Sequence, residues 1–297
     1  MFALKQNPYF KKIKALIKEV ADRIFRDHVG VFAAQASLFL VISFLPLVML
    51  LIAVMQFVIP FNREDVIRLV TSNVSPYIQG FVLTIVREIF DKPSVSLLSV
   101  TAVTTMWSAS KGVMALVQGL DQIYRGGRES YLKERLTAIL YTAIFLLVVV
   151  TSVGLMMAGK YLEGVIRDYA PVLHSALLFI LNKRTVLFLI MIALFFTLVY
   201  TFLPGSKRKF KYQLPGGIFS AVGWMAFSKI YAIYIENFSN FSYVYGSLTA
   251  IVLLMLWLYF CMNIFLLGAE LNVIGHEKRE EKRNLRIDET KKGQGDV

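Results

Sequence analysis

A lysine, Lys111, lies inside a long apolar stretch of the sequence, residues 94–125, where a charged side chain is unexpected. A lysine at the centre of a membrane helix costs about 2.5–3.5 kcal/mol on insertion scales. Ser108 and Gln118 stand three residues before it and seven after it, so these side chains share one face of a helix. Such a polar stripe can bind an anion inside the protein. The alternative is that the Lys111 side chain extends to the membrane surface.

A second lysine, Lys229, has a similar sequence context. The segments Trp107–Lys111 and Trp224–Lys229 both place an alanine and a serine between a tryptophan and the lysine. The segments lie in the second and fifth predicted spans, with two spans between them, so they run in opposite directions. Transporters built as inverted repeats show this pattern, here as two halves of three spans each (3+3). The alternative is a chance match between two short motifs.

A carboxylate, Glu270, follows the small residues Gly268 and Ala269 near the end of the last apolar stretch. Buried carboxylates can relay protons or pair with lysines, and the alternative is a hydrogen bond to a neighbouring helix. Gln35 adds a polar group to the first apolar stretch. We therefore predict a substrate-binding cavity between the two halves of the protein, lined by Lys111, Ser108, Gln118, Gln35, Lys229 and Glu270.

Metal-dependent and phosphate-dependent chemistry have no support in the sequence. The three histidines are far apart, and no pair has the spacing of a metal site such as H-x-H or H-E-x-x-H. The single cysteine, Cys261, lies in an apolar run and cannot form a disulfide within the chain. No glycine-rich phosphate-binding loop occurs. We expect no metal, no cofactor and no enzymatic activity.

The elements that would position these residues are membrane helices. The chain has 297 residues, of which 57% are hydrophobic and only 18% charged, and apolar runs of membrane-spanning length recur along it. We predict an all-α, polytopic membrane protein with an amphipathic interfacial helix over 1–30 and a charged, disordered tail over 274–297. The membrane domain, 31–273, contains six predicted transmembrane helices at about 31–59, 96–120, 136–158, 185–203, 214–237 and 247–273.

The basic residues indicate the orientation of these spans. Of the 32 Lys and Arg residues, 22 fall in the termini and in the loops after the second and fourth spans, and eight on the opposite side. The positive-inside rule then makes both termini cytoplasmic. The net charge of +12 is explained by this distribution, so we expect anionic lipids of the bilayer as partners and no nucleic acid. Homo-oligomerisation is left open.

Several motifs together resemble one bacterial family, YihY/virulence factor BrkB, over about residues 20–275. They are Trp107–Gly112, Leu214–Gly216, Tyr245–Ser247, Leu256–Tyr259 and the LGAELN segment that ends at Asn272. The chain departs from the family at Leu38 and Phe39, where tyrosines are frequent. The resemblance implies a multi-pass protein of the bacterial cytoplasmic (inner) membrane, associated with envelope integrity and, in some members, with virulence.

Two functions of different classes fit these observations. The first is a secondary transporter, exporter or lipid-translocating protein that acts on an anionic small molecule or lipid head group. The second is a non-transporting scaffold for envelope assembly, with the basic termini as docking segments. The resemblance also brings an old label, transfer-RNA-processing ribonuclease. We place it last, because the sequence lacks the histidine and aspartate cluster that a metal-dependent nuclease requires.

Overall fold

The computed structural model describes residues 18–58, 63–73, 79–80, 83–84, 86–87, 95–126, 130–148, 184–206, 208–237 and 249–295. The predicted interfacial helix is therefore described only from residue 18, and the predicted third span only as far as residue 148. The first two residues of the predicted sixth span, 247 and 248, also lie outside the described residues.

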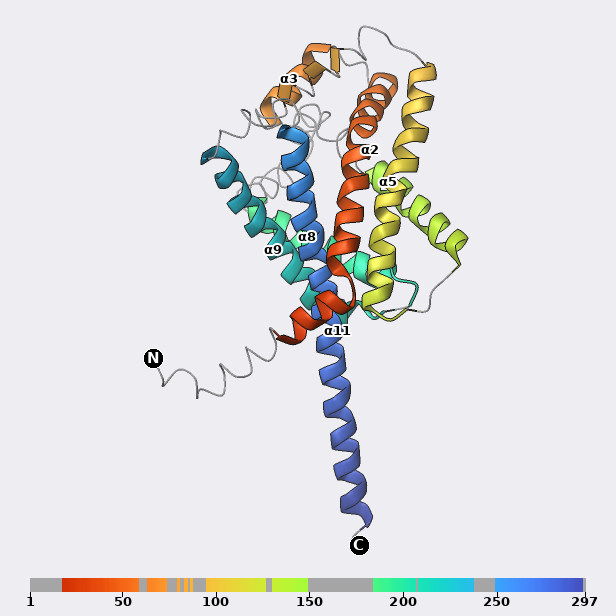
Figure 1. Ribbon diagram of the computed structural model, residues 1–297, viewed down its shortest axis with the longest axis vertical. Helices are drawn as coiled ribbons and strands as arrows, with labels where there is room; N and C mark the ends of the chain where they lie inside the picture. Colours follow the sequence, from red (N-terminus) through yellow and green to blue (C-terminus); the bar gives the residue numbers. More distant parts are fainter. Residues whose placement is uncertain are drawn as a thin grey trace, which may run out of the picture.

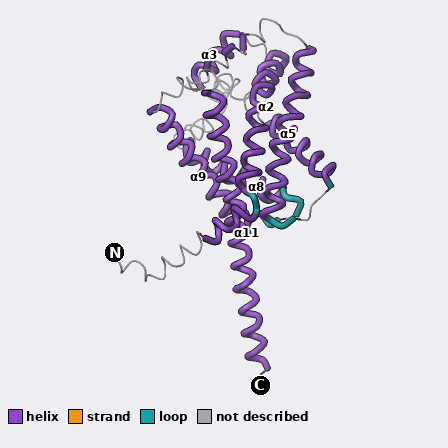
Figure 2. The backbone as a smooth tube through the Cα atoms, viewed as in Figure 1, coloured by secondary structure: helices purple, strands orange, loops and turns teal. Residues whose placement is uncertain are grey.

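All regular secondary structure in these ranges is helical, which confirms the all-α part of the prediction (Figure 2). A short helix, Lys18–Arg26, comes first, and another helix covers residues 131–148. The longer elements are α2 (Val29–Val58), α5 (Val95–Ile123), α8 (Arg184–Phe202), α9 (Phe210–Asn237) and α11 (Thr249–Gly295), and a shorter one is α3 (Arg63–Asn73).

Two of these helices contain stretches that are long and apolar enough to cross a membrane, Phe210–Ile235 and Ile251–Arg286. A third candidate is the pair Lys18–Arg26 and Val29–Phe44, which is bent by 59°. A shorter apolar helix covers Phe188–Phe202. The described residues thus contain two or three candidate spans by length and composition.

The helices pack as two pairs joined by α11 (Figure 1). α2 lies against α5, and α8 lies against α9. α11 contacts α9, α2 and α5, so it is the element that holds the pairs together. The end of α5, the loop between α8 and α9 and the helix Lys18–Arg26 gather where α11 leaves the bundle (Figure 1). Three of the segments that the charge pattern puts on one side of the membrane therefore meet at one end.

Many large apolar side chains of the bundle are exposed, and small or hydroxylated residues are frequent among the buried ones. On α8, Phe188, Met191 and Phe202 are exposed, whereas Ala193 and Thr197 are buried. In water such apolar surfaces would promote association. In a bilayer they face lipid, while small residues let helix backbones approach closely. The packing is that of a membrane protein.

Among the glycines in the described residues, the closest approach to another helix backbone lies between α9 and α11. A Cβ atom at Gly216 would clash with the carbonyl oxygen of Gly268 and with the Asn272 amide. A Cβ atom at Gly268 would clash with the hydroxyl of Ser220. On the other side of α9, Gly217 has the same relation to Thr197 of α8. These glycines allow α9 to pack between its two neighbours.

The first helix turns into α2 at a residue with left-handed backbone geometry. His28 has φ 52°, and its carbonyl oxygen accepts hydrogen bonds from the amides of Val31 (2.9 Å) and Phe32 (3.3 Å). It therefore begins α2 directly after the preceding helix has ended. Histidine is among the few non-glycine residues that tolerate this conformation. The 59° bend has a defined location.

The predicted C-terminal segment differs from the structure. Helix α11 continues through Gly295, where we expected a disordered tail, because the residues after Ile274 are rich in Glu, Lys and Arg, which favour helix. The helix Lys18–Arg26 is the described part of the predicted interfacial helix over 1–30. Its Arg23 is buried and pairs with Glu277 of α11.

We expect Gly216→Ala to destabilise the bundle by about 2 kcal/mol, because the new methyl group would clash with the Gly268 carbonyl oxygen, a backbone atom that cannot rotate away. Gly275→Ala is the matched control in α11. Its Cβ would meet no atom within 4 Å, and it should stabilise the helix by about 0.5–1 kcal/mol. Thermal unfolding in detergent micelles measures both. Equal melting temperatures for the two variants would contradict the close packing.

Candidate functional site

The six predicted cavity residues lie on four helices and in different environments. Ser108 is buried, Lys111 and Gln118 are partly buried, and all three lie on α5. Glu270, on α11, is fully buried. Gln35 of α2 and Lys229 of α9 are exposed. Lys111 and Lys229 therefore have different surroundings, and the sites described below include neither Gln35 nor Lys229.

Two cations gather around one indole ring, a group that we call the Trp107 cluster: Phe39, Trp107, Lys111 and Arg135. The Lys111 Nζ lies 5.2 Å from the ring centroid of Phe39 and 5.6 Å from that of Trp107. The Arg135 guanidinium lies over the Trp107 ring at 4.6 Å. The cluster joins α2, α5 and the helix over 131–148. Lys111 is thus directed into a protein contact with aromatic rings.

Arg135 is the unusual member of the cluster. The whole residue is only 8% exposed. Among the described residues, neither of its terminal guanidinium nitrogens has a hydrogen-bond partner. Cation–π contact contributes about 2 kcal/mol or more where the cation and ring are desolvated, but it provides no hydrogen-bond acceptor. A buried polar group left without a hydrogen bond costs about 1–3 kcal/mol, and more when it is charged. The aromatic contact alone therefore does not compensate for the buried charge, and an anion would.

The residue before it, Glu134, does not serve as that anion. Glu134 is buried, and its Oε2 accepts a hydrogen bond of 2.9 Å from the Nε2 of Gln118. Gln118 thus has a structural partner on the neighbouring helix. Together they tie α5 to the helix over 131–148 beside the Trp107 cluster.

Arg135 was not among the predicted site residues, because the third span was predicted to begin at residue 136. That start leaves Arg135 as the last residue of the basic loop after the second span. The helix begins at 131, five residues before the predicted start. Ser130 is the signal that could have located it. Its carbonyl oxygen accepts the amides of Lys133 and Glu134 at 2.9 and 3.1 Å, and serine is a preferred residue at the position before a helix.

A second polar group, the α5–α9–α11 network, is formed by Tyr124, Gln213, Gly216 and Asn272. The Tyr124 hydroxyl donates to the Gln213 Oε1 at 2.5 Å. The Asn272 amide donates to the Gln213 carbonyl oxygen at 3.1 Å and accepts from the Gly216 amide at 2.7 Å. Every contact is internal to the protein, so this network supports packing.

The loop between α8 and α9 is attached to the end of α5. Arg208 donates to the carbonyl oxygen of Tyr124 at 2.5 Å and lies over its ring at 5.0 Å. The Asp121 Oδ1 accepts the amide of Gly205 at 2.8 Å. A cation at the last carbonyl groups of a helix is favourable. Part of the basic charge at this end therefore has a structural role.

A third group contains the only predicted carboxylate, Glu270. Both of its oxygens are buried and lack a hydrogen-bond partner among the described residues. The carboxyl group of Asp27, which is also buried, lies beside it. Asp27 accepts two bonds from Arg26, 3.2 Å from Nε and 3.1 Å from a terminal nitrogen. We call Asp27 and Glu270 the carboxyl pair.

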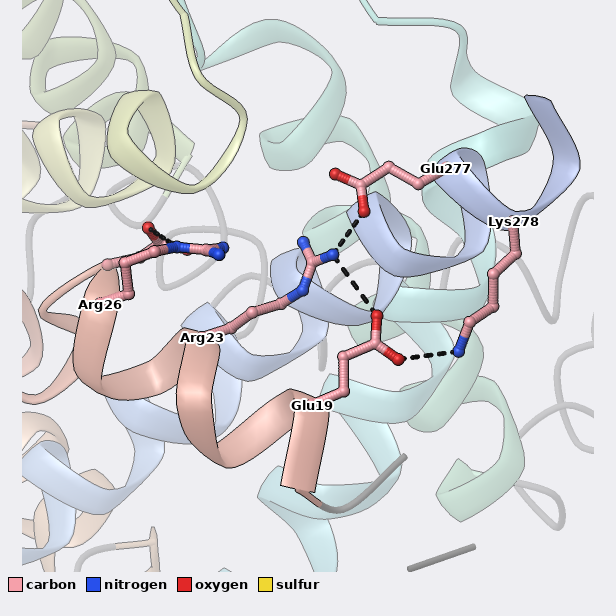
Figure 3. Close-up of polar contacts among 6 residues, drawn as sticks. Glu19, Arg23, Arg26, Glu277 and Lys278 are labelled. Atoms are coloured by element: carbon pink, nitrogen blue, oxygen red, sulfur yellow. Dashed lines mark hydrogen bonds and ion pairs between the residues drawn. The ribbon is translucent and has the colours of Figure 1, made fainter. Parts of the chain in front are cut away.

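Ion pairs hold the first helix to α11 just beyond the carboxyl pair (Figure 3). Arg23 pairs with Glu277 and, at 3.4 Å, with Glu19. Lys278 pairs with Glu19 at 3.0 Å. Arg23 is therefore already engaged by carboxylates other than Glu270. Within the described part of the chain, no three His, Cys, Asp or Glu side chains are placed to hold a metal ion.

Comparisons with known proteins agree on one family. The family model for virulence factor BrkB matches residues 20–292. The ribonuclease-like protein YfkH of Bacillus subtilis is 23% identical over 267 residues, 90% of this chain and 97% of that protein. A UPF0761 membrane protein of Psychromonas ingrahamii is 29% identical over 58% of this chain and 59% of its own length.

A UPF0761 membrane protein of Albidiferax ferrireducens is 24% identical over 86% of this chain, which spans 61% of that relative. The match to a UPF0761 membrane protein of Pseudoalteromonas translucida, at 34% identity, covers 32% of either chain. No solved structure matches this chain. Because the family model extends over most of the sequence, the chain belongs to the virulence factor BrkB family of membrane proteins.

Proposed function

We propose that this protein binds an anionic small molecule or lipid head group at the Trp107 cluster and moves it across the bacterial cytoplasmic membrane. The observation that carries the proposal is Arg135, a buried guanidinium without a hydrogen-bond partner among the described residues. Arginine presents a planar set of donors that matches carboxylate and phosphate oxygens. Lys111 supplies a second positive charge near the same ring.

The proposed topology has six spans with both termini cytoplasmic. Its support is that helices cover most of each predicted span within the described ranges, and that basic segments gather at one end of the bundle. The 3+3 inverted repeat stays a prediction. The paired packing of α2 with α5 and of α8 with α9 favours it, whereas the differing surroundings of Lys111 and Lys229 do not.

In this proposal the protein has no enzymatic activity and needs no cofactor, because binding and release of the anion require no covalent step. Anionic lipids are the proposed partners of the basic cytoplasmic segments. YfkH is named as a ribonuclease-like protein. For the chain described here we propose an anionic small molecule or lipid as ligand, and no nucleic acid. A homo-oligomer would be compatible with the exposed apolar surface of the bundle.

A scaffold function is the second candidate, and one feature favours it. The charged part of α11 projects beyond the bundle as a helix (Figure 1). Such a segment could dock an envelope enzyme without any ligand inside the membrane.

We expect Arg135→Gln to weaken binding of phosphatidylglycerol or of a dicarboxylate by about 10-fold to 150-fold, since a charged hydrogen bond contributes about 1.5–3 kcal/mol. Lys111→Gln should weaken it less, because its ammonium group is only partly buried. Lys229→Gln, an exposed lysine on α9, is the matched control and should leave affinity unchanged. Binding of phosphatidylglycerol to the purified protein is measured by native mass spectrometry, and binding of the dicarboxylate by equilibrium dialysis.

Unchanged binding of both ligand classes in Arg135→Gln would exclude the anion site. If truncation after residue 274 abolished cellular function while Arg135→Gln did not, the scaffold would replace the transporter.

The topology has its own test by labelling of single cysteines in spheroplasts. After replacement of Cys261 by Ala, we expect Lys209→Cys and Lys282→Cys to be protected from a membrane-impermeant thiol reagent. Glu64→Cys should be labelled, because it lies on the opposite side of the predicted membrane domain. Labelling of Lys282→Cys from outside would contradict a cytoplasmic C-terminus.

A further inference from the structure

The carboxyl pair is a second unexplained feature and shares no residue with the Trp107 cluster. Glu270 is fully buried on α11, and neither of its carboxyl oxygens has a hydrogen-bond partner among the described residues. A buried, unpaired carboxylate is strongly unfavourable, and such a group is normally paired, coordinated or neutralised. The surrounding charges decide which of these applies.

The charged groups near Glu270 are already engaged. Arg23, from the first helix, pairs with Glu277 and Glu19. Arg26, from the same helix, donates to both oxygens of Asp27. Just after α5, the Tyr124 hydroxyl donates to Gln213 of α9. The two arginines act on Glu270 only through their longer-range fields.

The adjacent carboxyl group of Asp27 supplies the remaining contact. Two carboxylates cannot hydrogen-bond to one another, because neither carries a hydrogen. One proton changes this, since a protonated carboxyl group is a donor and the ionised partner an acceptor. Asp27 receives two bonds from Arg26 and is the acceptor. Glu270 is therefore the group that carries the proton.

We propose that Asp27 and Glu270 form a proton-binding site that links the bend before α2 to α11. A proton suits the site better than a metal cation, which needs six or more oxygen ligands when it is as large as Ca²⁺. Two arginines beside the pair also repel a metal ion. The site requires no anion at the Trp107 cluster, so it stands independently of the transport function proposed above.

The position of the pair gives proton release a structural consequence. Asp27 directly precedes His28, the residue at which the first helix turns into α2, and Glu270 lies on the helix that joins the bundle. Loss of the proton leaves two negative charges at short range, which favours separation of the first helix from α11. In a transporter, such a site would couple proton binding to helix movement.

Infrared difference spectroscopy of the full-length protein in lipid nanodiscs tests the site. At pH 7 we expect a protonated-carboxyl band that disappears in Glu270→Gln. Asp27→Asn should retain a band at a shifted frequency, because the acceptor of the hydrogen bond has changed. A spectrum without this band, or one in which neither substitution alters it, would overturn the proposal. If Glu270→Gln does not fold, the Asp27→Asn spectrum tests the proposal by itself. A shifted band supports the proton site, and an unshifted band overturns it.

Glu134→Gln is the matched control, since it removes a buried carboxylate that accepts a bond from Gln118. The band should be the same in this variant as in the unaltered protein, and its loss there would overturn the assignment to Glu270. Replacing choline chloride with sodium chloride at constant pH should also leave the band unchanged. A decrease with sodium would identify a metal-cation site in place of a proton site.

Discussion

The close contact between α9 and α11 at Gly216 and Gly268 is the constraint on which the rest of the bundle depends. α11 is the helix that joins the α2–α5 and α8–α9 pairs, and it can approach α9 only where neither backbone carries a side chain. That approach brings the Asn272 amide within hydrogen-bond distance of Gly216 and Gln213. It also fixes the position of Glu270, which precedes Asn272 by two residues on α11.

The bilayer core contains no water to form hydrogen bonds with buried polar groups, so the protein must provide their partners. Most of those described here are satisfied in this way. The Tyr200 hydroxyl, fully buried, contacts Ser220 at 2.8 Å and donates to the carbonyl oxygen of Phe265 at 2.5 Å. Against this background Arg135 and Glu270 are informative, because one lacks an acceptor and the other lacks a donor. An anion and a proton are the respective remedies.

Much of the fold could be predicted because the membrane imposes simple rules on sequence. A stretch of about 20 apolar residues can cross a bilayer as a helix, and the helical extents predicted for four of the spans agree with α2, α5, α8 and α9 to within four residues at every end. The candidate site was predicted only in part. Lys111 was found because a charge stands out in an apolar run, whereas Arg135 was hidden among loop residues of the same charge. Asp27 was likewise assigned to a surface helix.

The sequence by itself determined that the chain is helical, that it belongs in a membrane, which family it resembles, and which of its helices carry unusual charges. Those properties follow from composition and local periodicity. Only the tertiary structure decided which of these groups lie together. It places Arg135 and Lys111 against the same Trp107 ring, and Asp27 beside Glu270. The reason is physical, since Arg135 is 28 positions from Trp107 and 24 from Lys111, and Asp27 is 243 positions from Glu270. Helix packing, which depends on glycine contacts between distant segments, brings them together.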